Sequence, residues 1–322
     1  MKRHALAGMF LAAFASSSAI AQEVNFGIIS TEASSNLRTV WQPFLDDMQK
    51  KTGLQVRSFF ASDYAGVIEA MRFNKVQIAW YGNKSAMEAV DRASGEVFAQ
   101  SVDKDGGAGY WSHIIVHRDS PFKTLDDLLK CDRTLDFGIG DPNSTSGFLV
   151  PMTFVFGARN VEPRQCFKTV RGANHEANAL AVANKLVHAA ANNNENLGRL
   201  KLTAPAKADE IRVIWTSPLI ASDPLVWRKD LAPEIKTKMS NFIFNYGVSD
   251  EREKKVLAGL GWSPFKKSTD DQLLRVRQME VSRSIMRLQG DASIPAEKKA
   301  AELAKLQQEY DALGRRIAAM TN

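Results

Sequence analysis

Short apolar runs alternate with amphipathic helical patterns from Val24 onward, and this alternation restricts the fold of the chain more than any other feature. Val24–Ile29, Val56–Phe60 and Val76–Trp80 are predicted strands, and a helical pattern follows each of them. After the first strand, apolar residues recur three and four positions apart, at Leu37, Val40, Trp41, Phe44, Leu45 and Met48. Sustained alternation of this kind favours an α/β fold with parallel sheets and helices on both faces.

The chain has 322 residues, which is enough for two domains at roughly 100–200 residues each. The alternation falls into two stretches, and we expect strand-like crossings between them near His117 and Thr216. Beyond Trp227 the pattern is helical throughout, so a helical C-terminal extension is predicted. The predicted domains are a leader over residues 1–21, lobe I over 22–118, lobe II over 119–217, and a return to lobe I with C-terminal helices over 218–322.

The first 21 residues have the pattern of a secretory signal peptide. Two basic residues precede the apolar run Ala5–Ala15, which is too short to span a bilayer. Ala19 and Ala21 place small residues at the positions that a signal peptidase reads, so we expect cleavage before Gln22. The alternative is a buried N-terminal helix, but such a helix needs polar positions in every turn and this stretch has none. The mature chain is therefore expected to be exported.

Composition and charge exclude two classes of protein. Hydrophobic residues make up 44% of the chain and charged residues 24%, which excludes a disordered chain. Loss of the leader removes two cations and no acids, so the formal net charge falls from +6 to +4. Lysine and arginine are interspersed with acidic residues instead of being concentrated on one helix, so nucleic acid is not an expected partner.

The chain contains two cysteines, Cys131 and Cys166, and export would permit a disulfide between them. Both lie at the ends of predicted elements. We expect them to be paired, with two separate thiols as the alternative. Neither belongs to a Cys-x-x-Cys motif, so redox catalysis has no support.

The last predicted helix has an apolar seam with alternating spacings of three and four, formed by Leu303, Leu306, Tyr310, Leu313, Ile317 and Met320. This spacing is typical of a coiled coil and would allow a homodimer through the C-terminal helices. The alternative is a hairpin in which the seam packs on the preceding helix, at Leu274, Val281, Ile285 and Leu288. Fewer than three heptads are present, so we favour the hairpin.

Metal and cofactor motifs are missing from the sequence. His113 and His117 are four residues apart, but the β-branched residues between them predict a strand, which separates the two rings by about 13 Å. Gly138 and Gly140 begin a dinucleotide-binding pattern, but Asn143 replaces its third glycine. No phosphate loop or nucleophile elbow occurs. We therefore expect no metal, no cofactor and no catalytic residue.

Three successive hydroxyl side chains, Ser144, Thr145 and Ser146, precede a predicted apolar helix over Phe148–Phe156. A helix start offers unpaired backbone N–H groups and the positive end of the helix dipole, which together suit an oxyanion. The alternative is simple capping, for which one hydroxyl is enough. Because three are present, we favour an anion-binding site.

Nine segments, in order along the chain, carry a family resemblance: Asn25–Glu32, Asp63–Ile68, Met71–Val76, Ala79–Asn83, Gly109–Ser112, Gly140–Pro151, His175–Asn184, Glu195–Leu197 and Ser217–Ile220. They closely resemble the periplasmic phosphonate-binding proteins of ABC importers. The resemblance implies a two-lobed type II periplasmic binding fold that closes over an aminoalkylphosphonate. It also implies that the closed protein delivers its ligand to an inner-membrane permease, which is driven by a cytoplasmic ATPase.

The resemblance further implies a ligand for each end of the site. The phosphonate oxygens would be held by Ser144, Thr145, Ser146, Tyr64, Tyr110 and His175, and the ligand amine by Glu195 and Asp223. Two carboxylates beside an oxyanion would repel it unless the ligand also carries a cation, so 2-aminoethylphosphonate is the expected ligand. Methylphosphonate, phosphite and phosphate are alternatives within the same fold, and all three leave the two carboxylates without a role. A more distant alternative is a periplasmic phosphonate or phosphoester hydrolase with Ser144, His175 and Asp223 as a triad.

Overall fold

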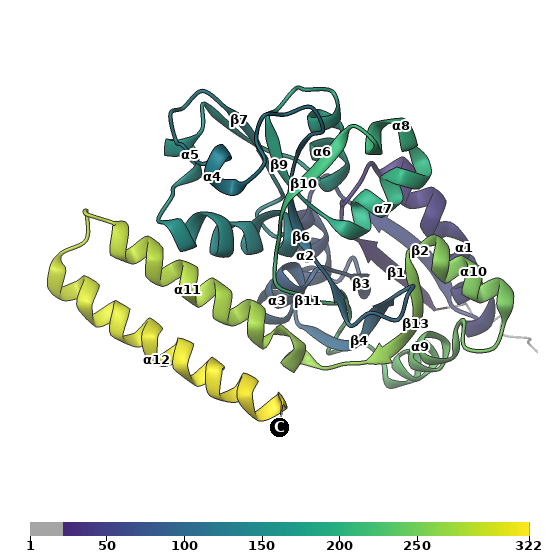
Figure 1. The fold of residues 1–322 in the computed structure, drawn as a ribbon. Coiled ribbons are helices and arrows are strands. Elements are labelled where there is room, and N and C mark those ends of the chain that lie inside the picture. Colours follow the sequence, from purple (N-terminus) through teal and green to yellow (C-terminus); the bar gives the residue numbers. More distant parts are fainter. Residues whose placement is uncertain (1–21, 322) are drawn as a thin grey trace, which may run out of the picture.

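Two sheets form the centres of two lobes in the computed structural model, which describes residues 22–321 (Figure 1). The lobe I sheet has the strand order β13-β4-β12-β3-β1-β2, and the lobe II sheet has the order β10-β6-β9-β7-β8. A short ribbon of β11 and β5 forms a third, two-stranded sheet. The predicted two-lobed α/β fold with a helical C-terminal extension is confirmed. The expected leader, residues 1–21, lies outside the described residues.

Helices surround both sheets. Lobe I contains β1 (Glu23–Ile28), α1 (Ser34–Thr52), β2 (Gln55–Phe60), α2 (Tyr64–Arg72), β3 (Ile78–Trp80), α3 (Asn83–Arg92), β4 (Gly95–Asp103), β12 (Pro224–Arg228), α9 (Pro233–Asn245), α10 (Glu251–Gly259) and β13 (Trp262–Lys267). Lobe II contains β6 (Ser112–His117), α4 (Leu125–Leu128), β7 (Asp136–Ile139), α5 (Pro163–Cys166), β8 (Thr169–Gly172), α6 (His175–Ala183), β9 (Ala189–Asn193), α7 (Asn194–Thr203), α8 (Pro205–Ala208) and β10 (Ile211–Thr216). The ribbon joins β5 (Gly109–Tyr110) to β11 (Ile220–Ala221).

The sheets are mixed, so the prediction of parallel sheets is wrong for several strands. β1 pairs in parallel with β2 and β3, and β7 pairs in parallel with β8 and β9. β12 runs antiparallel to β3 and β4, and β6 runs antiparallel to β9 and β10. The reason is the crossings, because β6 and β12 are the first long strands after the chain enters a lobe from the other one. Each enters at the carboxyl edge of the sheet and therefore runs against the parallel strands of that sheet.

Strand pairing also moves one lobe boundary. β6 belongs to the lobe II sheet, although the sequence analysis assigned residues up to 118 to lobe I. The first crossing therefore lies between β4 and β6, before His117. The second crossing lies between β10 and β12, after Thr216.

The expectation that only helices follow Trp227 is wrong at β13, which pairs antiparallel with β4 at the edge of the lobe I sheet. Its pairing register shifts between Ser263 and Lys266, around Pro264. Proline lacks an N–H donor and is tolerated only at such edges and irregularities. Trp262 and Phe265 are buried in the lobe I core, which anchors this short strand.

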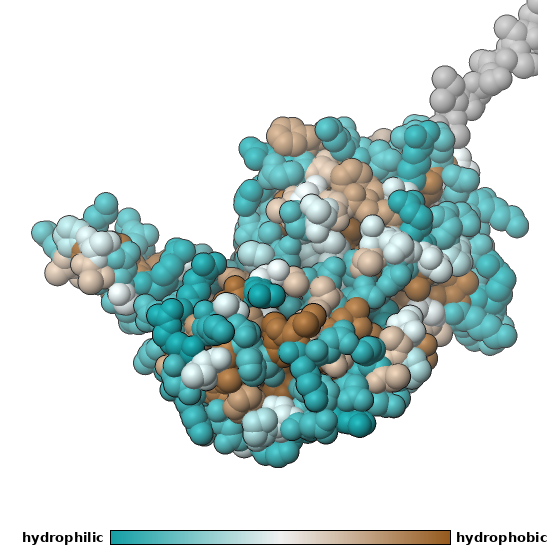
Figure 2. All heavy atoms as spheres, turned by 90° about the horizontal axis from the view of Figure 1, so that it is seen from above, coloured by the Kyte–Doolittle hydropathy of each residue, from teal (hydrophilic) through white to brown (hydrophobic). Residues whose placement is uncertain are grey.

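The C-terminal helices α11 (Leu274–Gly290) and α12 (Ala296–Thr321) form a hairpin that projects from the two lobes (Figures 1 and 2). Leu274, Val281 and Leu313 form a small core between them, and Leu306, Tyr310 and Ile317 pack against it. The predicted hairpin is therefore confirmed. Within residues 22–321, no helix combines the length and the hydropathy that a membrane span requires.

Cys131 and Cys166 form a disulfide, as expected, and link the segment before β7 to the end of α5. The pair closes a loop with a sequence separation of 35 residues. Closing a loop of this length lowers the conformational entropy of the unfolded chain, which stabilises the folded protein by about 3–4 kcal/mol. We expect reduction to lower the melting temperature, measured by calorimetry with and without reductant. Thiol titration of the denatured, unreduced protein should find no free thiol, and two free thiols would contradict the pairing.

Candidate functional site

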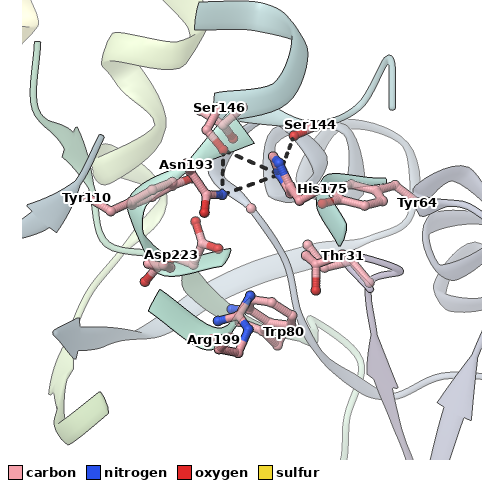
Figure 3. A pocket seen from close by; sticks show the side chains of 14 residues that line it. Thr31, Tyr64, Trp80, Tyr110, Ser144, Ser146, His175, Asn193, Arg199 and Asp223 are labelled. Atoms are coloured by element: carbon pink, nitrogen blue, oxygen red, sulfur yellow. Dashed lines mark hydrogen bonds between the residues drawn. The ribbon is translucent and has the colours of Figure 1, made fainter. Parts of the chain in front are cut away.

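A small polar pocket lies between the lobes, at the carboxyl ends of β1, β3, β7 and β9 (Figure 3). Crevices at this edge of α/β sheets are where such folds bind ligands. All eight residues predicted from the sequence line this one pocket: Tyr64, Tyr110, Ser144, Thr145, Ser146, His175, Glu195 and Asp223.

The three successive hydroxyls each accept one hydrogen bond from the protein. Ser144 Oγ accepts the Gly147 N–H at 3.0 Å, and Thr145 Oγ1 accepts the Lys84 N–H of lobe I at 2.9 Å. Ser146 Oγ accepts an amide hydrogen from Asn193 at 3.0 Å. Since a hydroxyl has one proton to donate in addition to its acceptor positions, all three can donate into the pocket. Capping and anion binding are therefore compatible at Ser144.

The helix that begins with these hydroxyls is wound differently from the expected α-helix. It contains two π-helical stretches, η1 (Thr145–Leu149) and η2 (Met152–Phe156). Gly140 and Gly147 pack so closely that a Cβ atom on Gly140 would lie 2.6 Å from the Gly147 Cα. This contact brings the end of β7 against the hydroxyl run, and π-helical turns of this kind are frequent at functional sites.

His175, at the start of α6, lies beside the hydroxyls. Its Nε2 atom is 3.4 Å from Ser144 Oγ, 3.5 Å from Ser146 Oγ and 3.4 Å from the Asn193 side-chain nitrogen. Burial, with a smaller contribution from the Arg199 cation, lowers the pKa of His175 to about 3. The imidazole is therefore neutral at pH 7 and offers one N–H donor.

The hydrolase alternative lacks a catalytic triad. A triad needs a carboxylate that orients the histidine through its second nitrogen. Within residues 22–321, His175 Nδ1 is buried without a hydrogen-bond partner. Asp223 is instead engaged by the Tyr110 hydroxyl, so Ser144 has no activated base beside it.

Two tyrosines come from outside lobe II. Tyr64 begins α2, and its backbone N–H donates to Asp141 Oδ2 across the cleft at 3.1 Å. Tyr110 lies in the ribbon between the lobes. Both are buried, and burial raises the pKa of each phenol above its usual value, with Asp223 adding to the shift. They are neutral donors at physiological pH.

Glu195 and Asp223 lie in the same pocket without a dedicated cation. Burial raises the pKa of Asp223 well above its usual value, and the nearby Glu195 charge raises it further. Burial also raises the pKa of Glu195, opposed by the Arg199 cation. Asp223 Oδ1 is buried and has no hydrogen-bond partner among the described residues. The pair is poised for a cationic group.

Arg199 is a pocket residue that the sequence analysis missed. Its guanidinium forms an ion pair with Glu32 of lobe I. Burial opposes the charged form, but the Glu32 and Glu195 carboxylates together raise the pKa of Arg199 above its usual value. A signal was present, because Arg199 lies one helical turn after Glu195 and therefore shares its face of α7.

Thr31, Trp80 and Asn193 also line the pocket and were not predicted as site residues. Thr31 Oγ1 and Trp80 Nε1 are buried and unpartnered among residues 22–321, so both can reach a ligand. Each of these three residues follows or ends a strand at the cleft. That position could have identified them once the strands were predicted.

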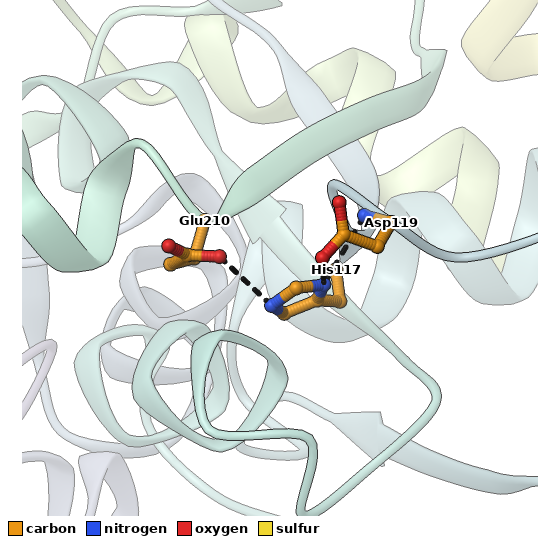
Figure 4. A group of neighbouring side chains, drawn as sticks. All are labelled: His117, Asp119 and Glu210. Atoms are coloured by element: carbon orange, nitrogen blue, oxygen red, sulfur yellow. Dashed lines mark hydrogen bonds and ion pairs between the residues drawn. The ribbon is translucent and has the colours of Figure 1, made fainter.

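A second group of titratable side chains lies outside the pocket, formed by His117, Asp119 and Glu210 (Figure 4). His117 Nε2 is 3.0 Å from Glu210, and its Nδ1 accepts the Asp119 N–H at 3.1 Å. Both ring nitrogens are therefore engaged. Arg118 pairs with the same Glu210 at 3.3 Å, so the group is an ion-pair network with its own cation.

Comparison with known proteins identifies the family. A family model described as "ABC transporter, phosphonate, periplasmic substrate-binding protein" matches residues 26–273. The "Phosphonates-binding periplasmic protein" of Escherichia coli K12 is 53% identical over 292 residues, which cover 91% of this chain and 86% of that protein. The "Phosphate-import protein PhnD" of Mycolicibacterium smegmatis is 27% identical and covers 68% of this chain and 70% of its own length.

A solved structure agrees with these relatives. The crystal structure of a binding protein component of an ABC phosphonate transporter from Pseudomonas aeruginosa superposes with a TM-score of 0.91 and 53% identity. The match covers 94% of this chain and all of the other. The fold, the pocket between its lobes and these similarities lead to one conclusion: this chain belongs to the family of periplasmic substrate-binding proteins of phosphonate ABC transporters.

Proposed function

We propose that this protein captures 2-aminoethylphosphonate between its lobes and delivers it to an inner-membrane permease. The observation that carries the proposal is the division of the pocket into two ends. Hydroxyl donors and a neutral histidine gather on one side of the pocket, and Asp223 lies across from them (Figure 3). Among the described residues, neither Asp223 nor Glu195 forms a salt bridge. A ligand with an oxyanion and an ammonium group is complementary to both.

The anion end is proposed to consist of Ser144, Thr145, Ser146, Tyr64, Tyr110 and His175, which are all neutral. The Tyr110 hydroxyl is hydrogen-bonded to Asp223 in the ligand-free pocket and is proposed to turn to the ligand oxyanion. Neutral donors suit an ABC importer, because the ligand must be released again to the permease. Hydrogen bonds to a charged group contribute about 1.5–3 kcal/mol each, so several of them support tight binding. Thr31 Oγ1 and Trp80 Nε1 have no hydrogen-bond partner among the described residues, and both side chains line the pocket, so they are proposed as further contacts.

The amine end is proposed to consist of Glu195 and Asp223. Three carboxylates, those of Glu32, Glu195 and Asp223, lie at or beside the pocket with one arginine. Arg199 pairs with Glu32, which leaves two buried acids without a full counter-charge. Buried charges require pairing, so an ammonium group on the ligand would complete the site.

Replacing Glu195 with glutamine tests the amine end. The change keeps the shape and removes one charge, so affinity for 2-aminoethylphosphonate should fall by about 1.5–3 kcal/mol. That is about one to two decades in Kd, measured by calorimetry. Methylphosphonate should bind with unchanged or higher affinity. It has no amine to lose a contact, and removal of the Glu195 charge reduces the repulsion of its oxyanion. An equal loss of affinity for both ligands would show that Glu195 does not recognise the amine.

Phosphate is the second candidate ligand, because the Mycolicibacterium relative is named for phosphate import. Methylphosphonate and phosphite belong to the same amine-free group. A thermal-shift panel separates these ligands from 2-aminoethylphosphonate, since a ligand at 1,000 times its Kd stabilises by about 4 kcal/mol. A larger shift with phosphate than with 2-aminoethylphosphonate would favour this second candidate.

We further propose that residues 1–21 act as a cleaved signal peptide that exports the chain to the periplasm. The segment has a basic start, a short apolar run and small residues before Gln22.

A homodimer through α11 and α12 is proposed as well, because the hairpin projects from both lobes (Figure 1). N-terminal sequencing of the exported protein and sedimentation of the full chain test these two proposals.

A further inference from the structure

The N-terminus of α1 lacks the groups that usually stabilise a helix start. Its N-cap residue, Ala33, has no side-chain capping hydrogen bond, and its first turn contains no acidic residue. A polar N-cap side chain and an acid in the first turn both stabilise helix starts in proteins. Within lobe I, the start of α1 is therefore incompletely capped.

Glu176 of lobe II supplies the missing group from across the cleft. Its Oε2 atom accepts the Ala33 N–H at 2.8 Å, and its Oε1 atom accepts the Asn36 side-chain amide at 2.7 Å. The Glu176 backbone N–H also donates to the Thr31 carbonyl at 3.4 Å. Both carboxylate oxygens are used by the opposite lobe, so an opening of the cleft must break both hydrogen bonds.

Lobe II does not use this carboxylate to cap its own helix. Asn174 is the N-cap of α6, and its side chain accepts the Ala177 N–H at 2.8 Å. The two short hydrogen bonds of Glu176 therefore serve the contact between the lobes, while its charge also lies in the first turn of α6.

The same loop of lobe I also reaches the ligand pocket. Ile29 and Thr31 line the pocket, and Glu32 pairs with the pocket residue Arg199. The segment from Ile29 to Asn36 thus connects the pocket to the rim, where Glu176 binds. Glu176 itself does not line the pocket, so it makes no direct contact with a ligand there.

We propose that Glu176 is a positioning residue that holds the cleft closed by capping α1 from the opposite lobe. The proposal rests on phosphonate binding within the cleft and not on which phosphonate binds. The contact forms after the lobes meet, so its loss should increase the dissociation rate and leave the association rate nearly unchanged.

Glu176→Gln removes the charge and one of the two acceptor oxygens. We expect 2-aminoethylphosphonate and methylphosphonate each to dissociate about fivefold faster, the scale of one helix N-cap, measured by stopped-flow fluorescence. Glu162→Gln is the matched control, because the Glu162 side chain caps α5 within lobe II by accepting the Arg164 N–H. The control should dissociate at the rate of the unaltered chain.

Asn36→Asp is the sharper test, because Asn36 is the third residue of α1. A carboxylate at this position can accept the Ala33 N–H from within the helix, and it repels Glu176. The ligand-free variant should therefore melt at the same or a higher temperature, while both ligands dissociate more than fivefold faster. A purely structural role would move stability and affinity in the same direction. Adding Glu176→Gln should restore part of the affinity, because its amide can donate to the new carboxylate.

Unchanged dissociation of both ligands from Glu176→Gln, or a slower rate from Asn36→Asp, would overturn the proposal. The proposed ligand is judged separately: equal effects of Glu195→Gln on both ligands reject amine recognition and leave this contact intact. The distance between spin labels on α1 and α8 tests the proposal without a ligand. In the ligand-free protein, Asn36→Asp should shift their distances to larger values, and unchanged distances would count against a role in closure.

Discussion

The ligand-free Asp223→Asn variant is expected to melt at a higher temperature than the unaltered chain and to lose most of its affinity for 2-aminoethylphosphonate. Burial raises the pKa of Asp223 well above its usual value, and Glu195 adds to this, so the ionised form destabilises the empty pocket. Asparagine removes that charge and keeps the shape. Affinity for 2-aminoethylphosphonate should fall by about 2–5 kcal/mol, the scale for losing one partner of a buried charge pair.

The pH dependence of the stability gain follows from the raised pKa. A carboxyl group whose pKa is raised on folding contributes stability below its unfolded pKa and loses it as pH rises through the folded pKa. The melting temperatures of the two proteins should therefore converge near pH 4 and separate toward pH 8. Asp46→Asn on the exposed face of α1 is the matched control and should show no such separation. A parallel offset at every pH would contradict this explanation.

The Ser144→Ala, Thr145→Ala double variant is expected to weaken every phosphonate and phosphate ligand by a similar factor. The two hydroxyls are proposed to donate to the group that these ligands share. At about 1.5–3 kcal/mol for each hydrogen bond to a charged group, the loss should reach about 3–6 kcal/mol, or two to four decades in Kd by calorimetry.

Thr153→Ala is the control for the hydroxyl variants. Thr153 lies in η2, and its hydroxyl donates to the Leu149 carbonyl, away from the pocket. Ser144 also caps η1, so the double variant should lose about 1 kcal/mol of stability in addition. Ligand affinity that is unchanged, or lost for 2-aminoethylphosphonate alone, would contradict the proposed anion end.

Much of the fold could be predicted from the sequence, because local patterns of apolar residues indicate most of its helices and strands. The helix of Trp41 and Phe44 has a strong apolar periodicity, and the strand at Val56 is short and ends in two phenylalanines. β13 was missed because Pro264 interrupts a six-residue strand whose stability comes from burial of Trp262 and pairing with β4. Pairing partners distant in the sequence leave no local pattern.

The site could be predicted only in part for a related reason. Hydroxyls in succession are visible in a sequence, so the run from Ser144 to Ser146 could be recognised from local chemistry. Arg199 reaches the pocket through its ion pair with Glu32, and the two residues are distant in the sequence. Glu176 likewise accepts the Ala33 N–H only when the lobes are in contact. Contacts between lobes depend on the closed arrangement, which no local pattern specifies.

The ribbon of β5 and β11 gives the molecule a modular architecture. Lobe II is one uninterrupted piece between the two ribbon strands, and Gly109 packs so tightly on Ile220 that a Cβ atom would lie 1.9 Å from its carbonyl oxygen. Tyr110 belongs to the ribbon and Asp223 follows it closely, while the Ser144 run lies in lobe II. A single cassette exchange between relatives, cut at the ribbon, would therefore transplant the hydroxyl run and leave Asp223 with the recipient.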